Sequence, residues 1–249
     1  MIITHASHHS WYKNVKADSL QQYSKSDRKK LEKTIRLAQS AGVVAEFKTV
    51  NEDFFEWFIP LYNQTISQKK SPNLYDVRGT TSGKTDGVYY YKTLTLKQDG
   101  VIVGGCIFSC WKGRYSIAYR IYERDWHGTS LSASPALYGE YLMDDYAQSH
   151  HKLILTHGLD RNLYGLNSSI GLAMFKLSVG CQAKLRLNYL EKYQIDTDQV
   201  HTDVLVLHYP ETGEDITEAT LVCLEENQPK YVQLKNYHQR LKINTLIRK

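Results

Sequence analysis

Val88–Tyr122 reads VYYYKTLTLKQDGVIVGGCIFSCWKGRYSIAYRIY, and this stretch decides the fold of the 249-residue chain. Apolar and polar side chains alternate along most of it, which is typical of strands with one buried face. Asp99-Gly100 is a tight-turn dipeptide, and Lys112-Gly113 interrupts the alternation a second time. The stretch therefore predicts three consecutive antiparallel strands, at 88–97, 101–111 and 114–122.

Helix and strand signals precede this meander. Ser26-Asp27 is a candidate N-cap, and Gly42 is a candidate stop for a helix whose apolar positions are Leu31, Ile35 and Ala38. A strand is expected at 43–50. A second helix is expected from Asn51, with a possible kink at Pro60 and an apolar face made of Phe54, Phe58, Leu61 and Tyr62.

Two segments of this half have no apolar period. Residues 1–23 predict a peripheral arm or a short strand. Residues 69–87 predict a loop, either beside an active site or on an ordinary part of the surface.

Helices and strands alternate after the meander. We expect a helix from Ser134-Pro135 to about 149, a buried strand at 152–156, a helix at 168–179 and a strand at 182–195. Further strands are expected at 204–209 and 217–224, followed by a basic helix or strand. This order predicts a mixed α/β sheet with helices on its faces. We expect an arm at 1–25, one domain at 26–195 and an extension at 196–249 packed on the same domain.

Bulk composition is that of a globular protein, with 42% apolar and 23% charged residues. No apolar run approaches the ~20 residues that a membrane span needs, and the first eleven residues lack the pattern of a secretory leader. The four cysteines form no CxxC pair, which favours free thiols in the cytoplasm. The histidines at 8–9 and 150–151 are adjacent rather than at metal-ligand spacing, so we assign no metal.

The net charge of +5 favours an anionic partner, such as a phosphorylated cofactor, a nucleotide-linked substrate, an acyl carrier protein or tRNA. Six basic residues lie in or next to the first expected helix: Lys25, Arg28, Lys29, Lys30, Lys33 and Arg36.

Three motifs, taken in order, resemble GNAT acyltransferases and especially their Fem-like branch. Residues 26–43, SDRKKLEKTIRLAQSAGV, resemble the basic helix and Gly-Val step at the start of Fem-like domains. Residues 98–105, QDGVIVGG, resemble a hairpin common to the superfamily, and residues 171–181, GLAMFKLSVGC, are similar to a Fem-like helix. The resemblance covers about 26–190 and implies a GNAT fold that moves an acyl group onto an amine.

One departure concerns the acyl donor. GNAT enzymes that use acyl-CoA carry an R/Q-x-x-G-x-G/A loop whose amides hold a pyrophosphate at a helix N-terminus. Here residues 126–135 read WHGTSLSASP, so the second glycine is missing. Gly128, Ser130 and Ser132 remain candidates to hold phosphate through amides and hydroxyls. We expect acyl-CoA or an acyl carrier protein as co-substrate, and no permanently bound cofactor.

The resemblance also implies where the acyl group lies. In GNAT folds the third meander strand splays from the next parallel strand and leaves peptide groups free. We place that gap between 119–122 and 153–157, with the donor's arm beside Tyr119, Ile121 and Tyr122. An N–H near Ile121 would polarise the carbonyl.

Candidate proton-transfer groups follow the strand at 152–156. His157 and Asp160 lie at its carboxyl end, where α/β sheets present ligand-binding residues. Either is a candidate to accept the amine proton, and Tyr164 is the candidate acid. A structural role is the alternative for both: Asp160 would cap a turn with Arg161, and His157 would be an ordinary core residue.

Two basic residues are candidates to bind substrate. By resemblance, Lys176 matches a Fem-like lysine that holds an anionic group of the substrate, and Arg36 would contact phosphate. The alternatives are a snorkelling lysine and a solvated helix face. We expect Glu140 and the pair at 144–145 to face solvent.

Three functions remain open from the sequence. The first is an N-acyltransferase that uses a thioester donor, from CoA or a carrier protein, and the amine of a small acceptor such as an amino sugar or amino acid. The second is a Fem-like ligase that takes an amino acid from aminoacyl-tRNA. The third is a non-enzymatic binding module on a GNAT scaffold.

Overall fold

The computed structural model describes residues 1–16, 20, 23–68, 74–81, 89–123 and 134–248. The chain forms two compact units, one of Asn14–Thr156 and the other of Met1–Lys13 with His157–Lys249. The first thirteen residues thus belong with the C-terminal part of the chain, which differs from the expected division at 25/26 and 195/196. The unit boundary lies inside strand β7 (Ile154–Arg161).

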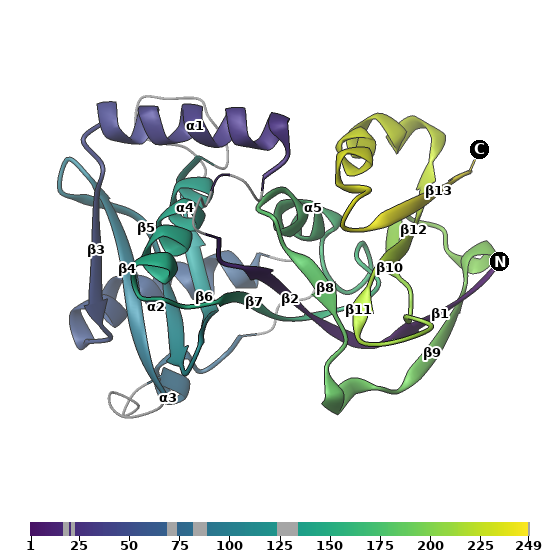
Figure 1. The fold of residues 1–249 in the computed structure, drawn as a ribbon, viewed down its shortest axis with the longest axis horizontal. Helices are drawn as coiled ribbons and strands as arrows, with labels where there is room; N and C mark the ends of the chain where they lie inside the picture. The colour runs from purple at the N-terminus through teal and green to yellow at the C-terminus, as the bar shows by residue number, and fades with distance from the viewer. Residues whose placement is uncertain (17–19, 21–22, 69–73, 82–88, 124–133, 249) are drawn as a thin grey trace. The chain divides into compact units, whose positions relative to one another are not determined.

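The unit of Asn14–Thr156 is built on the expected meander (Figure 1). Strands β4 (Tyr89–Gln98), β5 (Val101–Trp111) and β6 (Arg114–Tyr122) pair antiparallel in sequence order, as predicted. Strand β3 (Val44–Thr49) adds to the outer side of β4. On the other side, β6 pairs parallel with the first residues of β7.

Helices cover both faces of this sheet. Helices α1 (Lys25–Ser40) and α4 (Ser134–Ser149) share one core with the sheet residues Leu94, Phe108 and Tyr115. Helix α2 (Glu52–Ser67) packs on the opposite face through Phe54, Phe58 and Tyr62, and Val77 of the short helix α3 (Val77–Thr81) joins it. Helix α1 begins two residues earlier than expected, because Ser24 is the N-cap and its hydroxyl accepts from the amide of Asp27.

A β-bulge at Ala118 changes the face of the sheet to which the odd-numbered side chains of β6 point. Ile107 of β5 lies opposite Tyr119, whereas the next residue of β5, Phe108, lies opposite Ile117, so Ala118 is an extra residue. Before the bulge, Tyr115 and Ile117 face the α1 and α4 core. After it, Tyr119 and Ile121 face the α2 core, although all four positions are odd-numbered.

The other unit contains short strands from both ends of the chain. β1 (Ile2–Ala6) pairs with β9 (Lys192–Asp196), and β2 (His8–Asn14) pairs with β8 (Gln182–Lys184), which also contacts β11 (Asp215–Ile216). The expected arm is therefore a pair of strands, with Trp11 fully buried. The single strand expected at 182–195 is divided into β8 and β9 by a 3-10 turn at Leu187–Tyr189. These two strands pair with different strands, β8 with β2 and β9 with β1.

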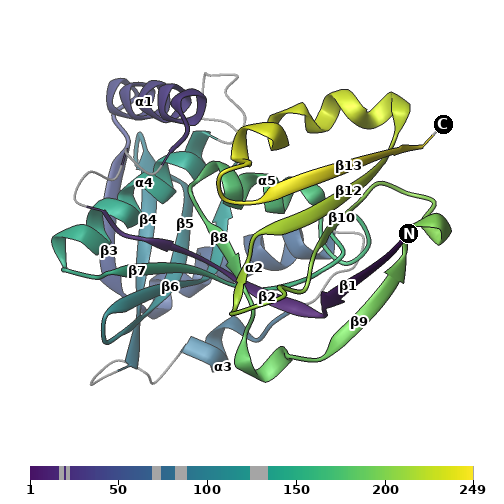
Figure 2. The same cartoon turned by 45° about the vertical axis from the view of Figure 1, so that its right-hand side comes forward.

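The remaining elements complete this unit. β10 (Val204–Leu207), β12 (Glu218–Leu224) and β13 (Lys242–Arg248) form a three-stranded sheet (Figure 2). Between β12 and β13 the chain makes a 3-10 segment at Glu225–Tyr237, and a short 3-10 turn lies at Thr197–Gln199. None of the described helices is both long and apolar enough to span a bilayer.

Helix α5 (Ile170–Ser178) is fixed at both ends. The hydroxyl of Ser169 accepts from the amide of Leu172 at 3.2 Å and caps the N-terminus. At the other end, the Lys13 ammonium donates to the Val179 carbonyl at 3.3 Å, and Arg240 donates to the Leu177 carbonyl at 2.6 Å. Because cations stabilise the negative end of the helix dipole, α5 is a rigid support for the side chains that it carries.

Candidate functional site

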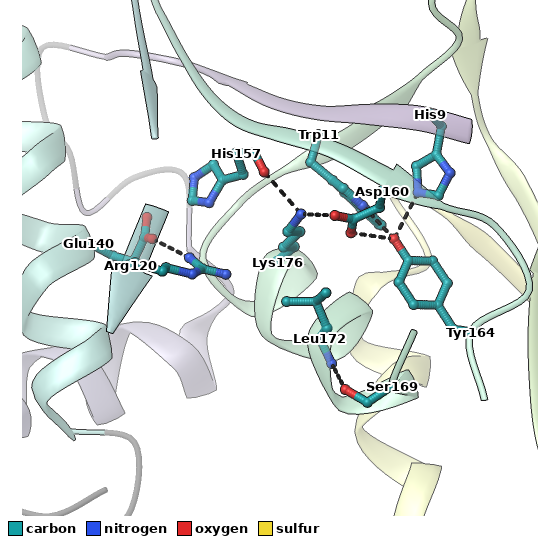
Figure 3. Close-up of polar contacts among 10 residues, drawn as sticks. All are labelled: His9, Trp11, Arg120, Glu140, His157, Asp160, Tyr164, Ser169, Leu172 and Lys176. Carbon is teal, nitrogen blue, oxygen red and sulfur yellow. Dashed lines mark hydrogen bonds and ion pairs between the residues drawn. The ribbon is translucent and has the colours of Figure 1, made fainter. Parts of the chain in front are cut away.

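A buried polar network joins β7, α5 and β2 within the unit that contains both chain termini (Figure 3). The Lys176 ammonium donates to Asp160 Oδ1 at 2.7 Å and to the His157 carbonyl at 3.0 Å. The Tyr164 hydroxyl donates to Asp160 Oδ2 at 2.7 Å. That hydroxyl also accepts from the Trp11 indole at 2.7 Å, and His9 Nε2 lies 2.8 Å from it.

These bonds determine the tautomer of His9. A tyrosine hydroxyl has one hydrogen and two lone pairs. Because Tyr164 gives its hydrogen to Asp160 and accepts from Trp11, the remaining partner, His9 Nε2, must donate. Nδ1 of His9 is therefore an acceptor, and it is buried without a hydrogen-bond partner among the described residues.

The charges of the network are balanced. Burial alone would raise the pKa of Asp160, but the Lys176 ammonium and the hydrogen bonds from Lys176 and Tyr164 outweigh it, so the pKa is lowered. Burial and the neighbouring carboxylate raise the pKa of Tyr164 well above its usual value. Burial lowers the pKa of His9 to about 3. At neutral pH the network thus holds a carboxylate, an ammonium, a neutral phenol and a neutral imidazole.

The structure brings together three residues that the sequence singled out: Asp160, Tyr164 and Lys176. His157 contributes its carbonyl to the same group, and its side chain is buried. Because the proton of Tyr164 is held by Asp160 and the charge of Lys176 is matched, this geometry fixes side chains in place more readily than it exchanges protons. The catalytic roles of His157, Asp160 and Tyr164 stay predictions.

Two members of the network, His9 and Trp11, were missed by sequence reasoning. Both lie on β2, more than 150 positions from Tyr164 in the chain. Their alternation with half-buried neighbours is a weak strand signal in HHSWYKN, the sequence of β2, and it does not identify the partner.

A second feature lies in the unit of Asn14–Thr156, at the edge of β6. Its parallel ladder with β7 consists of three pairs and ends at Ser116 and Thr156, two residues before the bulge at Ala118. Leu155 lies opposite Tyr115, so the paired part of β7 lies beside an earlier part of β6 than the sequence suggested. β6 continues for six residues past the last pair.

The register of β6 determines which of its peptide N–H groups face β5 and which face the opposite edge of the strand. The Glu123 amide donates to the Val103 carbonyl at 3.0 Å, so the Ile121–Gly105 pair, two residues along, is also a hydrogen-bonded pair. The N–H of Ile121 therefore faces β5, whereas the N–H groups of Arg120 and Tyr122 face the opposite edge. An acyl carbonyl along this edge would meet those two amides rather than that of Ile121.

The side chains predicted to line the donor site point into the two cores. Tyr119 packs edge-on against Tyr62 of α2, with ring centroids 5.6 Å apart, and Ile121 lies in the same cluster. Tyr122 turns to the other face, where its hydroxyl reaches Gly139 of α4. The predicted phosphate-binding residues Gly128, Ser130 and Ser132 lie outside the described residues.

Two of the three acidic residues of α4 are placed differently from the expectation, whereas Asp145 is exposed as expected. Glu140 and Asp144 are buried rather than exposed, because each has a polar partner. Arg120 of β6 donates to Glu140 at 2.9 Å, and the Tyr23 hydroxyl donates to Asp144 at 2.9 Å. Arg36 lies on the exposed side of α1, so its role in binding phosphate stays a prediction.

No family model matches the sequence, and no curated protein matches it. The chain is similar to the crystal structure of FemX at 12% identity with a TM-score of 0.54, over 77% of this chain and 62% of that one. It also matches L-PGS from Bacillus licheniformis at 12% identity with a TM-score of 0.46, over 70% and 52%. A tandem GNAT protein from the clavulanic acid biosynthesis pathway matches at 11% identity with a TM-score of 0.41, over 72% and 51%.

The chain thus spans between about half and three fifths of the length of these structures. At such identities, the likeness to FemX concerns the fold. The mixed α/β fold that the sequence predicted is confirmed, and FemX shares that fold.

Proposed function

We propose that the chain is an N-acyltransferase of GNAT and Fem type, which moves an acyl group from a thioester to the amine of a small acceptor. The observation that carries the proposal is the edge of β6. The parallel ladder stops at Ser116, a bulge follows at Ala118, and the next amides on that edge belong to Arg120 and Tyr122.

The chemistry of acyl transfer fits such an edge. Attack of an amine on a thioester places negative charge on the carbonyl oxygen, and fixed N–H donors stabilise that charge. A bulged strand between two packed cores holds its peptide groups rigidly, so little reorganisation is needed when the charge develops. The donor's arm would lie along Ile117–Tyr122, and Gly128, Ser130 and Ser132 are proposed to hold its phosphate.

The buried network is proposed to have a positioning role. The Tyr164 hydroxyl donates a hydrogen bond to Asp160, and the Lys176 ammonium also donates to Asp160. We therefore assign these three residues to the support of the carboxyl end of β7. His157, at that end, is proposed to accept the proton of the attacking amine.

Thiol release tests the proposal directly. Acetyl-CoA and acetyl-pantetheine would each be mixed with a panel of amino sugars and amino acids, and free thiol would be followed with a chromogenic disulfide. The expected result is thiol release that depends on one class of amine and falls at least tenfold in His157→Gln. If release does not occur, RNase-sensitive transfer from charged tRNA would indicate the Fem-like ligase, and transfer from neither donor would indicate a binding module.

Placement of the donor has its own test. A pantetheine thioester with a diazirine in its acyl group should, on illumination, label the peptide that contains Ile117–Tyr122. Labelling elsewhere, with turnover intact, would move the site away from β6.

A further inference from the structure

The positive charge of the unit of Asn14–Thr156 is concentrated on one helix. Helix α1 contains six basic and two acidic residues, a net charge of +4. The remainder of residues 14–156 contains thirteen basic and thirteen acidic residues and is neutral overall. Nearly all of the chain's net charge of +5 therefore comes from this helix.

Four of the cations lie in a row along the exposed side of α1. At 3.6 residues per turn, Lys25, Lys29, Lys33 and Arg36 fall within an arc of about 80° and extend roughly 16 Å along the axis. The buried residues Leu31, Thr34 and Ala38 lie on the opposite side. We call the four cations the α1 row; Figure 1 shows the helix that carries it.

The α1 row is available for a partner. All four side chains are exposed, and none of them has a carboxylate within 4 Å among the described residues. The ion pair on this helix joins Arg28 to Glu32, beside the row. Like charges at i, i+4 destabilise an isolated helix, so the row costs stability that a partner of opposite charge would restore.

We infer that the α1 row docks an acidic helix of an acyl carrier protein, which would deliver the acyl group for the reaction proposed above. This inference rests on the proposed function. Carboxylates repeated at i, i+4 on a partner helix would match the spacing of Lys25, Lys29 and Lys33, which is about 6 Å a step along the axis. Exposed ion pairs of this kind are individually weak and act chiefly on encounter and orientation, which suits a carrier that must arrive and leave once per turnover.

Two other anionic partners fit less well. Domains that bind nucleic acid are commonly basic as a whole, with a pI above about 9, whereas outside α1 this unit has no net charge. A helix that lies in a membrane interface buries its apolar side in lipid, whereas the apolar side of α1 is packed in the protein core.

Matched charge reversals test the row. Lys29→Glu/Lys33→Glu alters the row, and Lys30→Glu/Lys235→Glu makes the same change in net charge at two exposed lysines outside it. Binding of a purified holo-acyl carrier protein would be titrated by fluorescence anisotropy. The row variant should bind at least tenfold more weakly than wild type, the control within twofold, and raising the salt to about 0.5 M should weaken wild-type binding.

Kinetics separate docking from catalysis. The row variant should raise the KM for an acylated carrier protein at least tenfold and leave kcat/KM for acetyl-pantetheine unchanged. An equal rise of this KM in the row variant and in the control variant would overturn the inference. An equally large loss of kcat/KM for acetyl-pantetheine in the row variant would also overturn it. So would stronger row-dependent binding to a duplex RNA or to anionic vesicles than to the carrier protein.

Failure of the proposed function would be visible separately. If wild type releases no thiol from either donor, the transferase proposal fails, and the titration alone decides the docking: row-dependent binding supports it, and absence of binding overturns it.

Discussion

The Tyr164 hydroxyl donates its hydrogen to Asp160 at 2.7 Å. The same oxygen accepts hydrogen bonds from two residues of β2, Trp11 and His9. One oxygen atom thus connects the carboxyl end of β7 to the first strands of the chain. Because Tyr164, Trp11 and His9 are fully buried, the bonds among them cannot be replaced by water without opening the unit.

Tyr164→Phe should lower the free energy of unfolding by about 2–4 kcal/mol, because it removes one donor and leaves the buried groups of Trp11 and His9 without their acceptor. Urea unfolding followed by Trp fluorescence measures this loss. The matched control is Tyr209→Phe, whose hydroxyl makes one exposed bond to the Leu190 carbonyl and whose loss should cost less than about 1 kcal/mol. Equal effects of the two substitutions would contradict the network.

Lys176 and Asp160 should be strongly coupled. Lys176→Met leaves a buried carboxylate without its counter-ion and should cost about 3–5 kcal/mol. Asp160→Asn should also be costly, whereas the double variant should be clearly less unstable than the sum of the two. A double-mutant cycle by urea unfolding measures the coupling. Additive effects would show that the 2.7 Å ion pair does not contribute to folding.

The Asp160 carboxyl makes this contribution dependent on pH. Its pKa is lowered in the folded state, so its stabilisation is fully present above the unfolded value of about 3.9 and is lost as the pH falls through the lower folded value. The gap in stability between wild type and Asp160→Asn should therefore close below about pH 4, as measured by acid unfolding. A gap that stays constant to lower pH would contradict the lowered pKa.

His9 should dominate the pH dependence at milder acidity. Its pKa is about 3 when folded, against about 6.5 when unfolded, so the unfolded chain takes up a proton first and stability falls as the pH drops below 6.5. His9→Gln keeps an N–H donor for Tyr164 and should remove most of the slope between pH 6 and 4. An unchanged slope in His9→Gln would contradict the lowered pKa of His9.

Gly139→Ala tests the packing of Tyr122. An alanine Cβ at 139 would clash with the Tyr122 hydroxyl oxygen, so the substitution should destabilise the fold although alanine favours helices. At Gly171 of α5 the nearest atom would be 3.9 Å away, and Gly171→Ala should stabilise by roughly 0.5–1 kcal/mol. Thermal unfolding of the two variants should therefore shift in opposite directions.

Local patterns were sufficient to predict the meander and most of the helices. Each strand from β4 to β6 pairs with its neighbour in sequence, and the turns at Asp99-Gly100 and Lys112-Gly113 lie where the alternation breaks. The Ala118 bulge was not predictable in this way. Tyr119 and Ile121 continue the odd-numbered apolar positions, and the sequence contains no sign that they change face.

Long-range pairing accounts for most of what the sequence did not reveal. β1 pairs with β9 across about 190 residues, so the periodicity of the first residues could not identify their partner. A separation of more than 150 positions from Tyr164 likewise hid His9 and Trp11 from the site. Asp160, Tyr164 and Lys176 were found through their position after a strand or in a motif, but their mutual bonds required the structure. Glu140 was misplaced because its partner, Arg120, lies on another element.

The extra residue at Ala118 restricts the number of residues that β6 can contain between Arg114 and Tyr122. Segments exchanged between related chains would have to be joined before Arg114 or after Tyr122, because a junction that drops one residue would send Tyr119 and Ile121 to the wrong side of the sheet. Insertions tolerated in surface loops would not be tolerated here. An exchange of β6 between chains should therefore carry the whole strand.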